Sequence, residues 1–152
     1  MMKFLSLLIS AMCLLTSAET TNLDVIRANY NKVVSDKKMC KEIISQLEKT
    51  KNNSATHLAY LGGLQTIWAN HVFNPISKLN TFKEGKKNIE QAIKNEPDNV
   101  ELRYIRLSVQ KNAPSFLGYK SNIKNDTKFI KKNRQQISSD ISHKNIDTLL
   151  KD

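Results

Sequence analysis

The stretch FKEGKKNIEQAIKNEPDNVELRYIRLSVQ, residues 82–110, decides the fold. On each side of a central Pro-Asp-Asn sequence, apolar and small residues recur at the spacing of a helix that buries one face. The proline closes a corner, and the Asp or Asn that follows it can cap a new helix. We therefore predict a helix over residues 82–94 and a returning helix over residues 100–111. Thr81 is the expected N-cap of the first helix, with Glu84 completing a capping box.

Other segments predict further helices around this hairpin. Their apolar residues recur at helical spacing, and no part of the chain after residue 18 alternates with the period of a strand. The predicted fold class is all-α, a compact array of antiparallel helix hairpins. The further helices are expected at residues 23–34, 37–49, 55–72 and 127–137, with a last one from Ser138 or Ser139. Their expected N-caps are Thr21, Asp36, Asn53 or Ser54, and Asn125 or Asp126. Residues 76–80 are expected to form a loop or a single turn, and residues 23–49 form either two helices or one helix bent at Ser35.

The helix expected at residues 55–72 is the most apolar of these and has apolar residues nearly all round it. Such a helix is contacted on several sides, so we place it at the centre of the molecule. Gly62-Gly63 disfavours a helix, and the expected reason for this pair is the close approach of a neighbouring helix, with a helix break as the alternative. Trp68 is expected in the core rather than as a ligand platform.

Residues 1–18 have the three parts of a secretory signal peptide: Lys3, an apolar run and the small residues before Ala18. The apolar run is about 12 residues long, whereas a membrane-spanning helix needs about 20. We predict cleavage after Ala18 and export to the periplasm or the cell exterior, with retention of the leader as an anchor left open. Residues 19–152 are then one all-α domain, with basic helices over residues 112–152.

Cleavage at that point removes Cys13 and leaves Cys40 as the single cysteine, so no intramolecular disulfide can form. The core must therefore be built from ordinary apolar packing. Cys40 falls on the apolar face of its predicted helix, and we expect a buried thiol rather than a reactive one.

The central hairpin resembles part of a tetratricopeptide repeat. The residues that match the repeat's second helix are Gly85, Ile89, Ala92 and Pro97, and Leu61-Gly62 is similar to the Leu-Gly pair of its first helix. In the family, small residues let the paired helices approach. One repeat-like unit is recognisable, within residues 54–111, and about 22 residues separate its two glycines where the family has about a dozen. The resemblance implies that a concave helical face binds a protein or peptide.

The segment that follows, NAPSFLGY at residues 112–119, makes the chain similar to small exported bacterial proteins. This similarity implies a location and no mechanism. The segment gathers apolar residues around a proline, and we expect either a lid that closes the end of the core or a binding ledge.

The sequence contains no pattern of catalytic or metal-binding residues. The three histidines are His57, His71 and His143, and they belong to no nucleophile or metal motif. On one continuous helix the first two would lie about 21 Å apart, too far to share a metal. Six glutamates of the predicted domain fit solvated helix faces or caps: Glu42, Glu48, Glu84, Glu90, Glu96 and Glu101. We expect no enzyme, no catalytic residue, no metal and no cofactor, and a small hydrolase with a carboxylate pair is the weakest alternative.

Charge is the second functional signal. The whole chain has a formal net charge of +10, and loss of residues 1–18 removes one Lys and no acid, which leaves +9. Lysines concentrate in the second half of the chain and favour contact with anionic lipid or cell-wall polymer. Few aromatic residues interleave with them to stack on bases, so specific nucleic-acid binding is not expected.

We predict a non-enzymatic protein-interaction or scaffolding module of the cell envelope. The alternative is a basic domain that associates with an anionic membrane or cell-wall surface. Arg103, Arg106 and Gln110 line up at i, i+3 and i+7 on one side of their helix. Together with Phe116 and Tyr119, they are the residues that we expect to contact a protein or peptide partner.

Overall fold

The computed structural model describes residues 22–50 and 54–151 of the chain. These residues form seven α-helices and three short 3-10 helices, and no strand occurs among them. The α-helices are α1 (Leu23–Asn29), α2 (Lys37–Lys49), α3 (Ala55–Ala69), α4 (Pro75–Asn95), α5 (Val100–Asn112), α6 (Ile123–Asn133) and α7 (Asp140–Lys151). The 3-10 helices are η1 (Lys32–Val34), η2 (Ser115–Leu117) and η3 (Arg134–Gln136). The all-α prediction is confirmed, and the array is compatible with a helical-repeat fold. The predicted leader and the expected caps Thr21 and Asn53 lie outside the described residues, and the N-cap of α1 is Asn22, whose Oδ1 accepts from the N–H of Asp24 at 2.9 Å.

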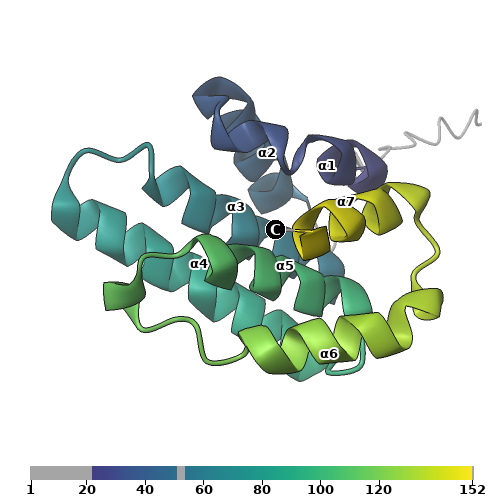
Figure 1. Cartoon of the computed structure of the whole chain (residues 1–152). Coiled ribbons are helices and arrows are strands. Elements are labelled where there is room, and N and C mark those ends of the chain that lie inside the picture. The colour runs from purple at the N-terminus through teal and green to yellow at the C-terminus, as the bar shows by residue number, and fades with distance from the viewer. Residues whose placement is uncertain (1–21, 51–53, 152) are drawn as a thin grey trace, which may run out of the picture.

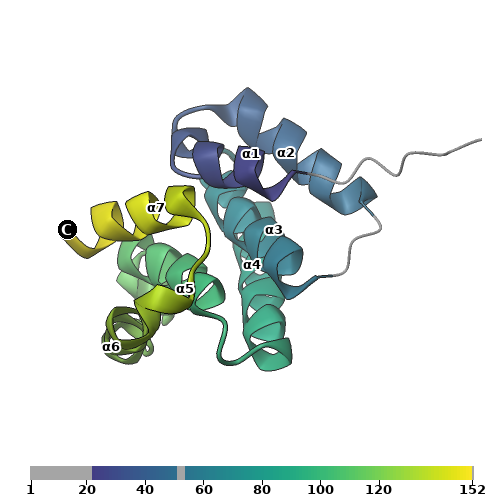
Figure 2. The ribbon, with the colours of Figure 1, turned by 90° about the vertical axis from the view of Figure 1, so that its right-hand side faces the viewer.

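Helix α3 lies at the centre of the array and contacts α2, α4 and α5. Its most extensive contact is with α4, with which it forms a long antiparallel hairpin (Figure 1). Figure 2 shows α1 and α2 above this hairpin, and α5, α6 and α7 along its left side. The central position predicted for residues 55–72 is confirmed, although the helix itself ends at Ala69.

Glycines set the distance between α3 and α4. A Cβ atom on Gly62 would lie 2.5 Å from the carbonyl oxygen of Gly85, and a Cβ on Gly85 would lie 2.5 Å from that of Gly62. A methyl group on either residue would therefore collide with backbone, which no change of rotamer can relieve. Helix α3 runs without interruption through Gly62-Gly63. The expected close approach is confirmed, and the alternative of a helix break is wrong.

Three of the predicted N-caps are confirmed. The side chains of Asp36, Ser54 and Asn99 each accept a hydrogen bond from a backbone N–H two or three residues ahead, at 2.9, 3.2 and 3.0 Å. These bonds satisfy donors that the first turn of a helix leaves without a partner. Because Asp36 caps α2 after the separate turn of η1, residues 23–49 are two helices and not one bent helix.

Helix α4 begins at Pro75, about two turns before the predicted start. Oδ1 of Asn74 accepts from the N–H of Ser77 at 3.0 Å, and the proline takes the first helical position, where its missing N–H costs no bond. Thr81, the predicted cap, lies inside the helix and donates to the carbonyl of Ser77 at 2.8 Å. The predicted loop over residues 76–80 is therefore wrong, because Asn74-Pro75 starts α4, while α3 has already ended at Ala69.

Helix α6 is also displaced from its predicted position, whereas α7 begins at Asp140, directly after Ser139, as predicted. Helix α6 was expected over residues 127–137, but it starts at Ile123 and ends at Asn133. Asp126 is not a cap; it lies in the first turn of α6 and its side chain is completely buried. That side chain turns toward α5, and such a tertiary contact leaves no mark in a local capping pattern.

One hydrophobic core joins the helices. Its largest fully buried side chains include Tyr60, Leu64 and Ile89. Cys40 is buried, as predicted, and Trp68 packs partly buried against the same core. Within the two described ranges, no helix combines the length and the apolar character needed to cross a membrane.

Candidate functional site

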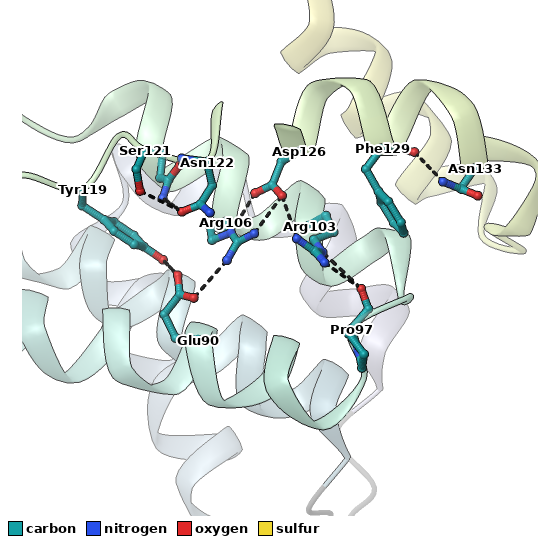
Figure 3. Close-up of polar contacts among 11 residues, drawn as sticks. Glu90, Pro97, Arg103, Arg106, Tyr119, Ser121, Asn122, Asp126, Phe129 and Asn133 are labelled. Carbon is teal, nitrogen blue, oxygen red and sulfur yellow. Dashed lines mark hydrogen bonds and ion pairs between the residues drawn. The ribbon is translucent and has the colours of Figure 1, made fainter. Parts of the chain in front are cut away.

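One face of α5 carries three of the side chains that the sequence singles out. Figure 3 shows Arg103 and Arg106 reaching toward Asp126 on α6. Arg106 is only 4% exposed, and its guanidinium donates to both carboxylate oxygens of Asp126, at 2.7 and 2.8 Å. Its Nη1 also donates to Oε2 of Glu90 on α4, at 2.9 Å. Arg106 thus ties α5 to α4 and α6 through charged hydrogen bonds, which are the stronger kind.

Arg103 lies one turn earlier on α5 and is half-buried. Its Nη1 donates to Oδ1 of Asp126 at 3.1 Å, so this one carboxylate pairs with two guanidinium groups. Its Nε and Nη2 donate to the carbonyl oxygen of Pro97, at 3.2 and 3.0 Å, across the α4–α5 corner. The guanidinium carbon lies 5.0 Å from the ring centre of Phe129, within the range of a cation–π contact. Every nitrogen of the guanidinium therefore has an intramolecular partner.

Gln110 and Tyr119 are buried and hold the segment that connects α5 to α6. Gln110 exchanges two hydrogen bonds with Asn122, at 3.0 and 3.1 Å. The hydroxyl of Tyr119 donates to Oε1 of Glu90 at 2.5 Å. Four of the five residues expected to contact a partner thus make contacts inside the molecule. The face of α5 on which three of them lie is covered by α6, which the spacing along α5 alone does not reveal.

Asp126 and Glu90, the acids in this cluster, are not among the contact residues predicted from the sequence. Glu90 was expected on a solvated helix face, but it is half-buried and accepts from both Arg106 and Tyr119. A signal for Asp126 does exist in the sequence. It is the only acidic residue between Glu101 and Asp140, in a strongly basic stretch, and buried arginines require a carboxylate.

A second buried carboxylate, Glu101, lies where four helices meet. Arg27 of α1 donates to both of its oxygens, at 2.7 and 2.8 Å. The hydroxyl of Tyr60 on α3 donates at 2.6 Å, and that of Ser142 on α7 donates at 3.0 Å. The expectation that Glu101 lies on a solvated face or at a cap is wrong. It does stand in the first turn of α5, but its side chain points into the core.

Burial alone would raise the pKa of Glu101. Hydrogen bonds from Arg27, Tyr60 and Ser142, together with the charge of Arg27, outweigh burial and lower the pKa below its ordinary value of 4.5. Burial and the neighbouring carboxylate hold the pKa of Tyr60 well above its ordinary value of 10. The stable forms are an ionised Glu101 and a neutral Tyr60, and both oxygens of the carboxylate already accept hydrogen bonds. The cluster therefore positions helices and offers no free base.

Phe116, the fifth predicted contact residue, lies in a different environment. Its side chain is 86% exposed and lines an open groove of about 560 Å³. The groove forms where η1 and η2 meet the C-terminal ends of α3 and α5 and the first turns of α4. In Figure 1 the α3–α4 connection and the green turn after α5 lie at the same end of the molecule, on the left. The segment after α5 therefore has two parts, a buried one at Tyr119 and an exposed ledge at Phe116.

The walls of this groove are mainly apolar. Phe82 is buried in it, and Leu79 and Val34 are exposed on its sides. Its polar lining includes Asn31, Asn70, Asn112 and Lys78. None of the described residues that line it is acidic, so its only charge is the Lys78 ammonium.

The groove is suited to binding. Its volume falls within the range of about 300–1,000 Å³ typical of ligand sites, with apolar walls and a few polar groups. Among residues 22–50 and 54–151, no group of three or more His, Cys, Asp or Glu side chains is placed to hold a metal ion. No known protein family, curated protein or solved structure matches this chain.

Proposed function

We propose that this chain is an exported, non-enzymatic interaction module of the cell envelope, and that it binds an apolar segment of a partner protein in the groove. The observation that carries the proposal is the groove itself. It is concave, and its apolar walls are exposed at Val34, Leu79 and Phe116. Contiguous exposed apolar surface on a small protein marks an interaction site more often than a chance feature.

The composition of the groove favours a peptide segment. Leu79 and Phe116 offer apolar contacts to an anchoring side chain. The amides of Asn31, Asn70 and Asn112 can donate to carbonyl oxygens and accept from N–H groups of a peptide backbone. Lys78, with no acid beside it in the lining, favours a segment that carries a carboxylate.

The resemblance to a tetratricopeptide repeat supports the same proposal. Gly62 and Gly85, the small residues that it pairs, do pack against each other at the α3–α4 crossing. The additional residues between them extend both helices beyond that crossing, and the extension of α4 at Pro75, Lys78 and Leu79 forms one wall of the groove. We interpret the hairpin as one repeat-like unit with a lengthened end, which supplies the concave surface. Export rests on the predicted leader.

Site-specific photo-cross-linking tests this function. A benzophenone amino acid would replace Phe116 in the chain expressed with its own leader, and a matched probe would replace Val25, an exposed apolar residue of α1 outside the groove. We expect irradiation of cells to give a discrete protein adduct at position 116 and none at position 25. Adding Leu79→Ser to the chain that carries the probe at position 116 should abolish the adduct.

An adduct of equal yield at both positions, or one that persists in the Leu79→Ser chain, would reject the groove as the binding site. Reversing the charge of Arg106 is not a suitable control. Its side chain is buried against Asp126, so a carboxylate there would destabilise the fold itself.

A further inference from the structure

The corner between α3 and α4 carries two large apolar side chains that the groove does not use. Phe73 is 94% exposed and Ile76 is 73% exposed, and neither lines the groove. Every residue from 73 to 80 is exposed, although the chain is helical from Pro75 onward. The first turn of α4 therefore projects from the body of the molecule, at the left end in Figure 1. Two such residues three positions apart form a patch rather than scattered surface positions.

The surroundings of this corner are basic. The Nζ atom of Lys37 lies 5.7 Å from the ring centre of Phe73, and Lys78 follows Ile76 by two positions. The sequence has no acidic residue between Glu48 and Glu84, a stretch that includes the whole corner. The net charge of the chain, +10, has the same sign. A partner for this corner must therefore tolerate apolar side chains and carry negative charge.

We propose that the α3–α4 corner binds an anionic phospholipid surface, with Phe73 and Ile76 inserted beneath the headgroups and Lys37 and Lys78 among them. Phe73 and Ile76 lie outside the groove and are largely exposed, and a lipid interface closes around whatever side chain enters it. Apolar side chains of peripheral proteins enter the boundary of headgroups and acyl chains to a depth of about 5–10 Å. Lysine stems reach from apolar surroundings to the charged layer above.

This contact goes beyond the proposed groove function and does not depend on it. An acidic protein surface would match the charge of the corner but would offer no apolar layer to the exposed side chains of Phe73 and Ile76. An anionic cell-wall polymer would match the charge and has no apolar layer for Phe73 and Ile76 to enter. An anionic lipid surface accounts both for the exposed apolar side chains of the corner and for its positive charge.

Vesicle binding tests the proposal. A chain that begins at Glu19 keeps every core residue that the structure describes. Its partition would be measured by co-sedimentation with phosphatidylcholine vesicles with and without phosphatidylglycerol, at low and high salt. We expect binding only to the vesicles that contain phosphatidylglycerol, and we expect part of this binding to persist at high salt. The double change Phe73→Ser and Ile76→Ser should lower the partition coefficient about tenfold or more. The matched change Val25→Ser should alter it by no more than about twofold.

A second measurement reports insertion directly. Ser77→Cys places a thiol at the corner, and Gln135→Cys places one on η3; Cys40 is buried and does not compete for the label. An environment-sensitive dye at position 77 should brighten and shift to the blue with anionic vesicles, while the dye at position 135 should not change.

Three results would overturn the proposal. The first is no binding to anionic vesicles. The second is binding that high salt abolishes and that the Phe73 and Ile76 changes leave intact, since this would be attraction to the lysine surface alone. The third is unchanged vesicle binding in the double variant together with loss of the protein adduct at Phe116, which would assign the corner to the groove partner. If Leu79→Ser abolished the protein adduct but left vesicle binding normal, the groove and the lipid-binding corner would be two separate sites, and the lipid proposal would be supported.

Discussion

Gly62 and Gly85 meet backbone to backbone where α3 crosses α4. A Cβ on either residue would lie 2.5 Å from the carbonyl oxygen of the other. Replacement by Ala normally stabilises a helix by about 1 kcal/mol, but here the helices must move apart. We expect Gly62→Ala or Gly85→Ala to lower the free energy of unfolding by about 3 kcal/mol, measured by urea denaturation.

Gly118 is the control for this crossing. It has a φ of 63°, and a Cβ there would meet no heavy atom within 4 Å. Gly118→Ala should therefore cost only about 1 kcal/mol, from backbone strain and not from crowding. If Gly62→Ala were as stable as the unmodified protein, the close approach of α3 and α4 would be refuted.

Asp126 neutralises two arginines in the interior. Its carboxylate is completely buried and accepts from Arg103 and Arg106. Asp126→Asn removes the charge at nearly constant volume and leaves a buried guanidinium without its main partner. We expect a loss of about 3 kcal/mol in the free energy of unfolding. Glu42→Gln, in an exposed pair with Lys38, should change it by less than about 0.5 kcal/mol. Equal effects of the two changes would contradict the role of Asp126.

Glu101 makes the free energy of unfolding depend on pH in the acid range. Its pKa is lower in the folded chain than its ordinary value of 4.5, so the unfolded chain takes up the proton more readily. The stabilisation is fully present above about pH 4.5 and is lost as the pH falls through the lower folded-state pKa. Urea midpoints measured between about pH 6 and pH 3 should therefore fall more steeply for the unmodified protein than for Glu101→Gln. Parallel slopes would show that Glu101 is not a source of the acid sensitivity.

The thiol of Cys40 should be unreactive toward alkylating reagents in the native protein. Burial, and then the charge of Asp36, raise the pKa of its thiol to about 11, and the side chain is completely buried. Only the thiolate reacts with alkylating reagents, so in a chain that begins at Glu19 we expect no labelling of Cys40 at about pH 8 in the folded state and complete labelling in urea. Rapid labelling without denaturant would mean that α2 leaves the core on the timescale of the reaction.

Local features of the sequence were sufficient for much of the fold. The helix after Pro97, the caps at Asp36, Ser54 and Asn99, and the small residues at the α3–α4 crossing were all predicted. Helices and caps depend on residues within one or two turns of the same helix. The close crossing depends on the small size of glycine, which the residue type alone determines. The error at Pro75 is of another kind. A proline can end one helix and begin the next, and only the packing of the neighbouring elements decides which it does.

The stretch around residues 82–110 determined that the chain turns from one helix into the next at Pro97, because periodicity and capping are properties of neighbouring residues. The hairpin at the centre of the array is instead α3–α4. Which face of α5 is open to a partner was decided only by tertiary structure. Glu101 meets Arg27 across 74 residues, and Arg106 meets Asp126 across 20. Burial of a charge depends on such distant partners, and so does the position of a groove. The charged face predicted as a contact surface is therefore interior, while the exposed surface lies at Phe116, Leu79 and Phe73.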